Sequence, residues 1–96
     1  MRRCYLVFYD IRNAKRLRRV HKVLKGYGEP WQFSVFFCVL REIDRVRLQT
    51  DLEDVMNLKK DQTVLIDLGA EEQNVRKGLH VIGPPLPERE DGTVTI

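Results

Sequence analysis

CYLVFYD, at residues 4–10, is a run of six apolar residues that ends at an aspartate. Aromatic and β-branched side chains dominate the run, and it is too short for a helix, so it predicts a buried central strand. The residues after Asp10 are turn-prone, and Asn13 is a residue type that caps helix N-termini well. We therefore expect a helix to follow this strand, with Asp10 at the junction.

The expected helix after Asn13 is amphipathic, and its exposed face is basic. Apolar residues recur along it at helical spacing, at Leu17, Val20, Leu24 and Tyr27. Seven Lys/Arg and no acid lie between residues 12 and 25, namely Arg12, Lys15, Arg16, Arg18, Arg19, Lys22 and Lys25. The helix should end at residues 26–30, GYGEP, because glycine favours helix ends and proline cannot continue a helix.

The rest of the chain predicts further strands and a second helix. Residues 31–40, WQFSVFFCVL, predict either one long bent strand or two strands joined by a tight turn. A helix should run from about Asp44 to just before Lys59, followed by a strand at 63–68, a polar connection at 71–77 and a short last strand at 79–82. This order predicts an α+β ferredoxin-like sandwich, in which two helices cover one face of an antiparallel sheet.

We predict one domain at residues 1–83, followed by a proline-rich spacer and a C-terminal strand at residues 84–96. PPLP at 84–87 is too stiff to fold back tightly, whereas TVTI at 93–96 regains strand character. A strand beyond a rigid spacer often pairs with another subunit. A chain of 96 residues also gains from the extra burial of a dimer, so we expect a homodimer that exchanges this strand.

Charge is strongly polarised along the chain. Residues 1–28 hold nine Lys/Arg and one acid, a net +8, whereas residues 29–96 hold eight Lys/Arg and thirteen acids, a net −5. This pattern favours a polyanionic partner over a merely solvated helix face. The aromatic residues of the expected strands are more typical of a core than of base-stacking platforms: Tyr5, Phe8, Phe33, Phe36 and Phe37. We therefore expect recognition of a duplex through its backbone.

Other classes of protein are disfavoured by the sequence. No run approaches the roughly eighteen apolar residues that span a bilayer, and the N-terminus has no signal-peptide cleavage site, so we expect a cytoplasmic protein without a membrane partner. Cys4 and Cys38 lack metal-site or redox spacing and should be buried, reduced thiols. His21 and His80 show no metal-ligand spacing, and Ser34 has no triad partners, so all three are interpreted as structural.

Asp10 has two interpretations from its position alone. It could cap the first helix beside Asn13, which spacing favours, or it could bind a hard cation such as Mg²⁺. Magnesium takes one or two carboxylates and completes its shell with waters and substrate phosphates. A symmetric dimer could supply the second carboxylate from the other Asp10.

Three segments together resemble the Cas2 family of CRISPR-associated proteins: YDI at 9–11, QFSVF at 32–36 and VIG at 81–83. The resemblance covers residues 4–83. It implies a ferredoxin-like fold and a two-fold dimer in which the two Asp10 residues face each other across the interface and share Mg²⁺ in a phosphodiesterase site. It also implies a partnership with the Cas1 integrase when new spacers are acquired.

The same resemblance implies roles for further residues. Tyr9, Arg18 or Arg19, and Phe36 correspond to family positions connected with nuclease function, beside the catalytic Asp10. The expected nucleic-acid-binding residues, for DNA or RNA, are Arg12, Lys15, Arg16, Arg18, Arg19 and Lys22. The implied function is an endonuclease of CRISPR adaptation, either an endoribonuclease or a duplex DNase. The alternatives are a non-catalytic adaptor that bridges Cas1 integrase dimers on DNA, and a toxin-like ribonuclease of the same fold.

Overall fold

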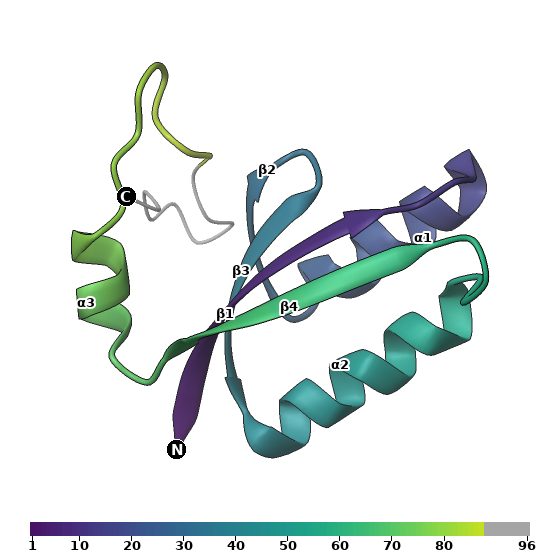
Figure 1. The fold of residues 1–96 in the computed structure, drawn as a ribbon, viewed down its shortest axis with the longest axis horizontal. Coiled ribbons are helices and arrows are strands. Elements are labelled where there is room, and N and C mark those ends of the chain that lie inside the picture. The colour runs from purple at the N-terminus through teal and green to yellow at the C-terminus, as the bar shows by residue number, and fades with distance from the viewer. Residues whose placement is uncertain (88–96) are drawn as a thin grey trace.

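The structure is a computed structural model that describes residues 1–87 (Figure 1). Its elements are, in chain order, β1 (Arg2–Asp10), α1 (Ala14–Lys25), β2 (Gly28–Gln32), β3 (Val35–Arg41), α2 (Glu42–Val55), β4 (Gln62–Gly69) and α3 (Glu72–Lys77). The four strands form one sheet in the order β2-β3-β1-β4, in which every neighbouring pair is antiparallel. The predicted α+β ferredoxin-like fold is confirmed.

CYLVFYD forms most of β1, which lies between β3 and β4. The β1–β3 pairing runs from Arg2↔Arg41 to Phe8↔Val35, and β1 ends where Asp10 pairs with Gln62 of β4. The main core lies between the sheet and helices α1 and α2. It is made of alternate β1 residues and their neighbours: Tyr5, Val7, Tyr9, Val20, Leu24, Phe36, Cys38, Leu40, Leu48 and Leu52.

A second, smaller cluster buries Cys4, Trp31 and Phe37. The rings of Trp31 and Phe37 stack in parallel with centroids 4.5 Å apart, and the Arg76 guanidinium lies 4.9 Å from the Phe37 centroid. Val75 of α3 packs against this cluster. Figure 1 shows α3 at the end of the molecule opposite α1. The prediction of a polar connection at 71–77 is therefore wrong, because contacts with the Trp31–Phe37 stack stabilise a short helix there.

The predicted last strand at 79–82 is also wrong for the described part of the chain. Leu79 packs against the Trp31–Phe37 cluster, whereas Val81 and Ile82 are exposed and belong to no strand. The start of residues 79–82 is therefore held by the packing of the Leu79 side chain rather than by strand pairing. The predicted C-terminal strand at 93–96 lies outside the described residues, and the domain boundary at residue 83 remains a prediction.

Residues 31–40 contain the end of β2, a turn at residues 33–34 and all of β3 except Arg41. The first strand begins earlier than expected, at Gly28. A Cβ atom at Gly28 would lie 2.5 Å from the backbone oxygen of Phe37, so only glycine fits where β2 approaches β3. The second helix begins at Glu42 rather than Asp44, with Asp44 held by Arg41 at 2.8 Å.

The two cysteines are the buried thiols that the sequence predicts. Cys4 and Cys38 are free and fully buried, and burial raises the pKa of Cys38 to about 12. Within residues 1–87, none of the helices has the length and apolar character needed to cross a bilayer.

Candidate metal and nucleic-acid site

Asp10 lies at the exposed end of β1. Its side chain is 62% exposed, and Nη2 of Arg12 lies 3.0 Å from Oδ2. It does not cap α1, because Asn13 holds that position and accepts a 3.0 Å hydrogen bond from the backbone N–H of Arg16. The capping interpretation of Asp10 is therefore wrong, and its carboxylate is open to a cation from solvent.

The described residues contain no group of three His, Cys, Asp or Glu side chains that could hold a metal ion. A cation at Asp10 would therefore find at most one further ligand of these four residue types in this part of the chain. Exposed carboxylate oxygens suit a hard cation such as Mg²⁺, which keeps several waters in its shell. Asp10 therefore fits magnesium as one ligand of a site completed by water and phosphate.

Asp61, immediately before β4, anchors the turn that follows Asp10. Its side chain is fully buried. Oδ1 accepts hydrogen bonds from the backbone N–H of Arg12 at 2.9 Å and from Nη2 of Arg16 at 3.1 Å. Oδ2 accepts from Nε of Arg16 at 2.7 Å and from the backbone N–H of Asn57 at 2.8 Å. These contacts, the Arg16 side chain first, hold the pKa of Asp61 well below its usual range.

Sequence reasoning missed Asp61 because it stands among charged loop residues and lies 45 positions from Arg16. One signal was present: the strand that follows Asp61 is antiparallel to β1, so its start must lie beside the end of β1. The consequence concerns the basic face of α1. The Arg16 guanidinium is committed to an internal ion pair instead of facing solvent freely.

The remaining basic residues of α1 stay on its outer surface. Arg12 is paired with Asp10, whereas Lys15, Arg18, Arg19 and Lys22 are exposed and make no ion pair within residues 1–87. Val20 and Leu24 are buried on the opposite face of the helix. Four cations thus gather on one surface without acidic neighbours, which is the arrangement expected of a phosphate-binding face.

Tyr9 and Phe36 lie inside the molecule, with 7% and 0% of their surfaces exposed. The Tyr9 hydroxyl donates to the backbone oxygen of Phe33 at 3.1 Å and lies 3.2 Å from Nδ1 of His21. The rings of His21 and Phe36 meet edge-on, with centroids 5.2 Å apart. Burial raises the pKa of Tyr9. The Phe36 ring is not placed to touch a substrate directly, whereas Tyr9 lines a pocket together with Leu17, Arg18, His21 and Phe33.

Phe33 differs from the other aromatic residues of the strands. Its side chain is 82% exposed, whereas Tyr5, Phe36 and Phe37 are buried. The expectation that Phe33 belongs to the core is therefore wrong, because the residue falls in the turn between β2 and β3 rather than within a strand.

Comparisons with known proteins decide the family. The family model described as CRISPR associated protein Cas2 matches residues 2–76. The chain belongs to the CRISPR-associated Cas2 family. A Geobacter sulfurreducens relative named CRISPR-associated endoribonuclease Cas2 is 37% identical over 83 residues, 86% of each chain. A Rhodospirillum rubrum relative with the name CRISPR-associated endoribonuclease Cas2 1 is 41% identical over 68 residues, 71% of this chain and 67% of that protein.

Solved structures agree with the Cas2 assignment. The crystal structure of Streptococcus pyogenes Cas2 superposes with a TM-score of 0.74 at 29% identity, covering 83% of this chain and 99% of that one. A hypothetical protein from Thermus thermophilus superposes with a TM-score of 0.76 at 31% identity, covering 92% of this chain and all of that one. The Cas2 family match favours a CRISPR-associated role over a free-standing toxin-like ribonuclease.

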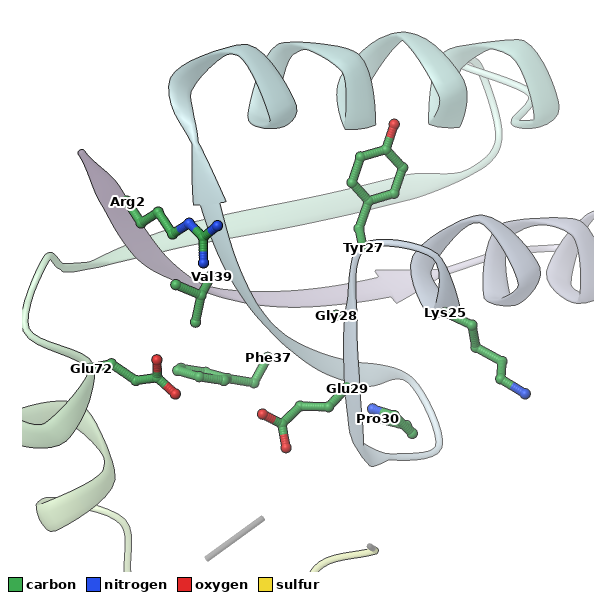
Figure 2. A pocket seen from close by; sticks show the side chains of 9 residues that line it. All are labelled: Arg2, Lys25, Tyr27, Gly28, Glu29, Pro30, Phe37, Val39 and Glu72. Atoms are coloured by element: carbon green, nitrogen blue, oxygen red, sulfur yellow. The ribbon is translucent and has the colours of Figure 1, made fainter. Parts of the chain in front are cut away.

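A separate cavity of this Cas2-family chain lies beside β2, with a volume of about 380 Å³ (Figure 2). Its lining combines the cations Arg2 and Lys25 with the acids Glu29 and Glu72. Both acids also pair with Arg76. None of the residues predicted for the Cas2 nuclease site lines this cavity. The candidate site therefore lies at the other end of the sheet, where Asp10, α1 and the β2–β3 turn meet.

Proposed function

We propose that this chain is a Mg²⁺-dependent endonuclease of a CRISPR system that acts as a homodimer, with the Asp10 residues of both subunits sharing one metal site. The observation that carries the proposal is the exposed Asp10 carboxylate at the end of the central strand, just before the turn that leads into the basic helix α1. The names of the curated relatives support phosphodiester hydrolysis, because these relatives are named endoribonucleases.

Asp10 lies on the sheet face that α1 and α2 leave uncovered. Side chains alternate along a strand, so Asp10 shares its face with Leu6 and Phe8, whereas Tyr9 points to the helices. Leu6 pairs with Ile66 and Phe8 with Val64, and none of these four is fully buried. An antiparallel sheet facing water normally carries polar residues there. A second copy on this face would cover the apolar rows and bring two Asp10 residues together.

The chain's own residues supply the remaining parts of the proposed site. Arg18 and Arg19 are exposed and can bind the phosphates on either side of the scissile bond, which stabilises negative charge as it develops. Asp61 positions the turn after Asp10 through the backbone of Arg12. Magnesium bound between the two Asp10 carboxylates would activate water and stabilise the charged transition state.

The test is cleavage of a labelled single-stranded RNA and a labelled duplex DNA, each with Mg²⁺ and with chelator. We expect Mg²⁺-dependent cleavage by the parent protein, which Asp10→Asn abolishes while folding and binding stay intact. Asp54→Asn, which removes an exposed carboxylate of α2, is the matched control and should cleave like the parent. Full cleavage by the Asp10 variant, or a monomeric mass in light scattering, contradicts the proposal.

A non-catalytic adaptor that holds DNA between Cas1 integrase dimers is the second candidate. The four unpaired cations of α1 favour it, since phosphate contacts bind a duplex without any chemistry. Duplex binding by the parent without cleavage, combined with intact spacer integration, would support the adaptor.

A further inference from the structure

We infer that Phe33 and the pocket beside it bind an unpaired nucleobase of a single-stranded nucleic acid. This inference rests on the proposed function, since it names the substrate class that the site prefers. It departs from the expectation of backbone recognition alone, and the exposed position of Phe33 is the reason.

Phe33 is an aromatic residue without a packing role in the main core. Its side chain is 82% exposed at the β2–β3 turn, although its backbone oxygen is held by the Tyr9 hydroxyl at 3.1 Å. The backbone is therefore fixed while the ring remains in solvent. Ring faces presented in this way are the platforms on which proteins stack single-stranded bases.

The pocket beside Phe33 has a volume of about 350 Å³ and is lined by Tyr9, Leu17, Arg18, His21 and Phe33. Pockets of about 300–1,000 Å³ are typical for small ligands, so one base fits. Leu17, Tyr9 and Phe33 provide apolar walls, and the exposed Arg18 places a cation at the same pocket. An apolar slot beside a cation matches a base with its attached phosphate.

The hydrogen bonds of the Tyr9 hydroxyl favour one tautomer of His21. The Tyr9 hydroxyl uses its proton on the backbone oxygen of Phe33, so its contact with His21 at 3.2 Å requires a proton on Nδ1. In that tautomer Nε2 carries no proton and can accept a hydrogen bond from an amino or imino group of a base. The pocket thus combines stacking with one polar acceptor.

An unpaired base is favoured over other occupants by what surrounds the pocket. Lys15, Arg19 and Lys22 lie on the same helix as Arg18 and His21, without acidic partners among the described residues. A base within a duplex is already stacked on both faces and cannot enter the pocket. Tyr9 and Asp10 are adjacent in β1, so a bound base lies at the same end of the sheet as the proposed metal site.

The experiment measures binding in chelator, where cleavage cannot interfere. The probes are a single-stranded oligoribonucleotide, single-stranded DNA of the same sequence, the blunt DNA duplex, and a strand of equal length whose central nucleotides lack bases. The variants are Phe33→Ala, Phe33→Trp and the control Ile43→Ala, which truncates a half-exposed apolar side chain of α2. The two single strands show whether the base is taken from RNA, from DNA or from both.

We expect Phe33→Ala to weaken single-strand binding by about tenfold, the loss of one base stack, with less than about a twofold effect on the duplex. Phe33→Trp should restore binding, and Ile43→Ala should leave it unchanged. The slope of log affinity against log salt should not change, because Phe33 carries no charge. Removal of the bases from the strand should weaken its binding to the parent protein and leave its binding to Phe33→Ala almost unchanged.

The inference would be overturned if Phe33→Ala lost equal affinity for single strands and for the duplex, or if it bound single strands like the parent. A change of oligomeric mass in Phe33→Ala would also overturn it, because the ring would then serve a contact between copies of the chain. Failure of the proposed function gives a different result. Base-dependent binding through Phe33 without cleavage in Mg²⁺ would support the base-binding pocket and contradict only the proposed nuclease activity.

Discussion

The buried carboxylate of Asp61 accepts a 2.7 Å hydrogen bond from Nε of Arg16, which joins the loop before β4 to the first turns of α1. The same carboxylate holds the backbone N–H of Arg12, two residues after Asp10. A single side chain therefore fixes the path of the chain from the proposed metal ligand into the basic helix. It also removes one arginine from the surface that is proposed to bind phosphate.

The Asp61 carboxyl should make stability fall in acid. Its pKa is depressed in the folded state, so its contribution is present above the unfolded pKa of about 3.9 and is lost as pH falls through the lower, folded value. Asp61→Asn should destabilise the protein at neutral pH and flatten the loss of unfolding free energy below about pH 4. Urea unfolding at a series of pH values measures this effect.

Asp54→Asn is the control for the acid experiment and should keep the parent's pH dependence. Asp44, which is partly buried, and Asp67, which is exposed, also have lowered pKa values, through Arg41 and Arg3, and act in the same direction. A variant at Asp61 that loses stability in acid as steeply as the parent would show that these outer pairs control the transition.

Arg18 and Arg19 should contribute to nucleic-acid binding where Arg16 does not. Removing one cation that binds a phosphate lowers the slope of log affinity against log salt by about 1, so Arg18→Gln with Arg19→Gln should lower it by about 2. Arg16→Gln should reduce stability, because it leaves the buried Asp61 carboxylate without its cation, and should keep the parent slope. Duplex affinity measured across a salt series tests these expectations. A larger change of slope in Arg16→Gln than in the double variant at Arg18 and Arg19 would contradict them.

Phe36 should affect cleavage through stability alone. Its ring is fully buried in the main core, so Phe36→Ala should lower the unfolding free energy by about 3–5 kcal/mol, whereas Phe36→Leu should cost less. Chemical denaturation gives both values, and cleavage is then compared at temperatures where each variant is folded. A fully folded Phe36→Leu protein without activity would instead assign Phe36 a direct role in the reaction.

Deletion of residues 88–96 should weaken the proposed dimer. The strand-like TVTI segment follows a stiff PPLP spacer, and β4 is an edge strand of the sheet with one side open to pairing. Light scattering over a range of protein concentrations should show dissociation of the shortened chain at concentrations where the full chain stays dimeric. An unchanged dimer would place the interface on the sheet face opposite α1 and α2 alone.

The central strand, the basic amphipathic helix and the ferredoxin-like order of elements can all be predicted from local sequence patterns. These features depend on the spacing of apolar residues within a few helical turns or a few strand positions. That spacing can be read from the sequence without knowledge of distant contacts. CYLVFYD and the cap at Asn13 are clear cases. The exposed end of β1 at Asp10 was also predictable, because a charged residue after an apolar strand marks the edge of the core.

Which polar and aromatic groups meet depends instead on how the elements pack together. Asp61 reaches Arg16 because β4 returns antiparallel to β1 and places the start of one strand beside the end of the other. The helix at 72–77 forms against the Trp31–Phe37 stack, and six residues cannot be stable without such contacts. Phe33 is a residue type that is usually found in a core. It lies in the turn at residues 33–34, however, and its ring is exposed to solvent. Contacts between distant segments depend on register and turn position, which no local pattern contains.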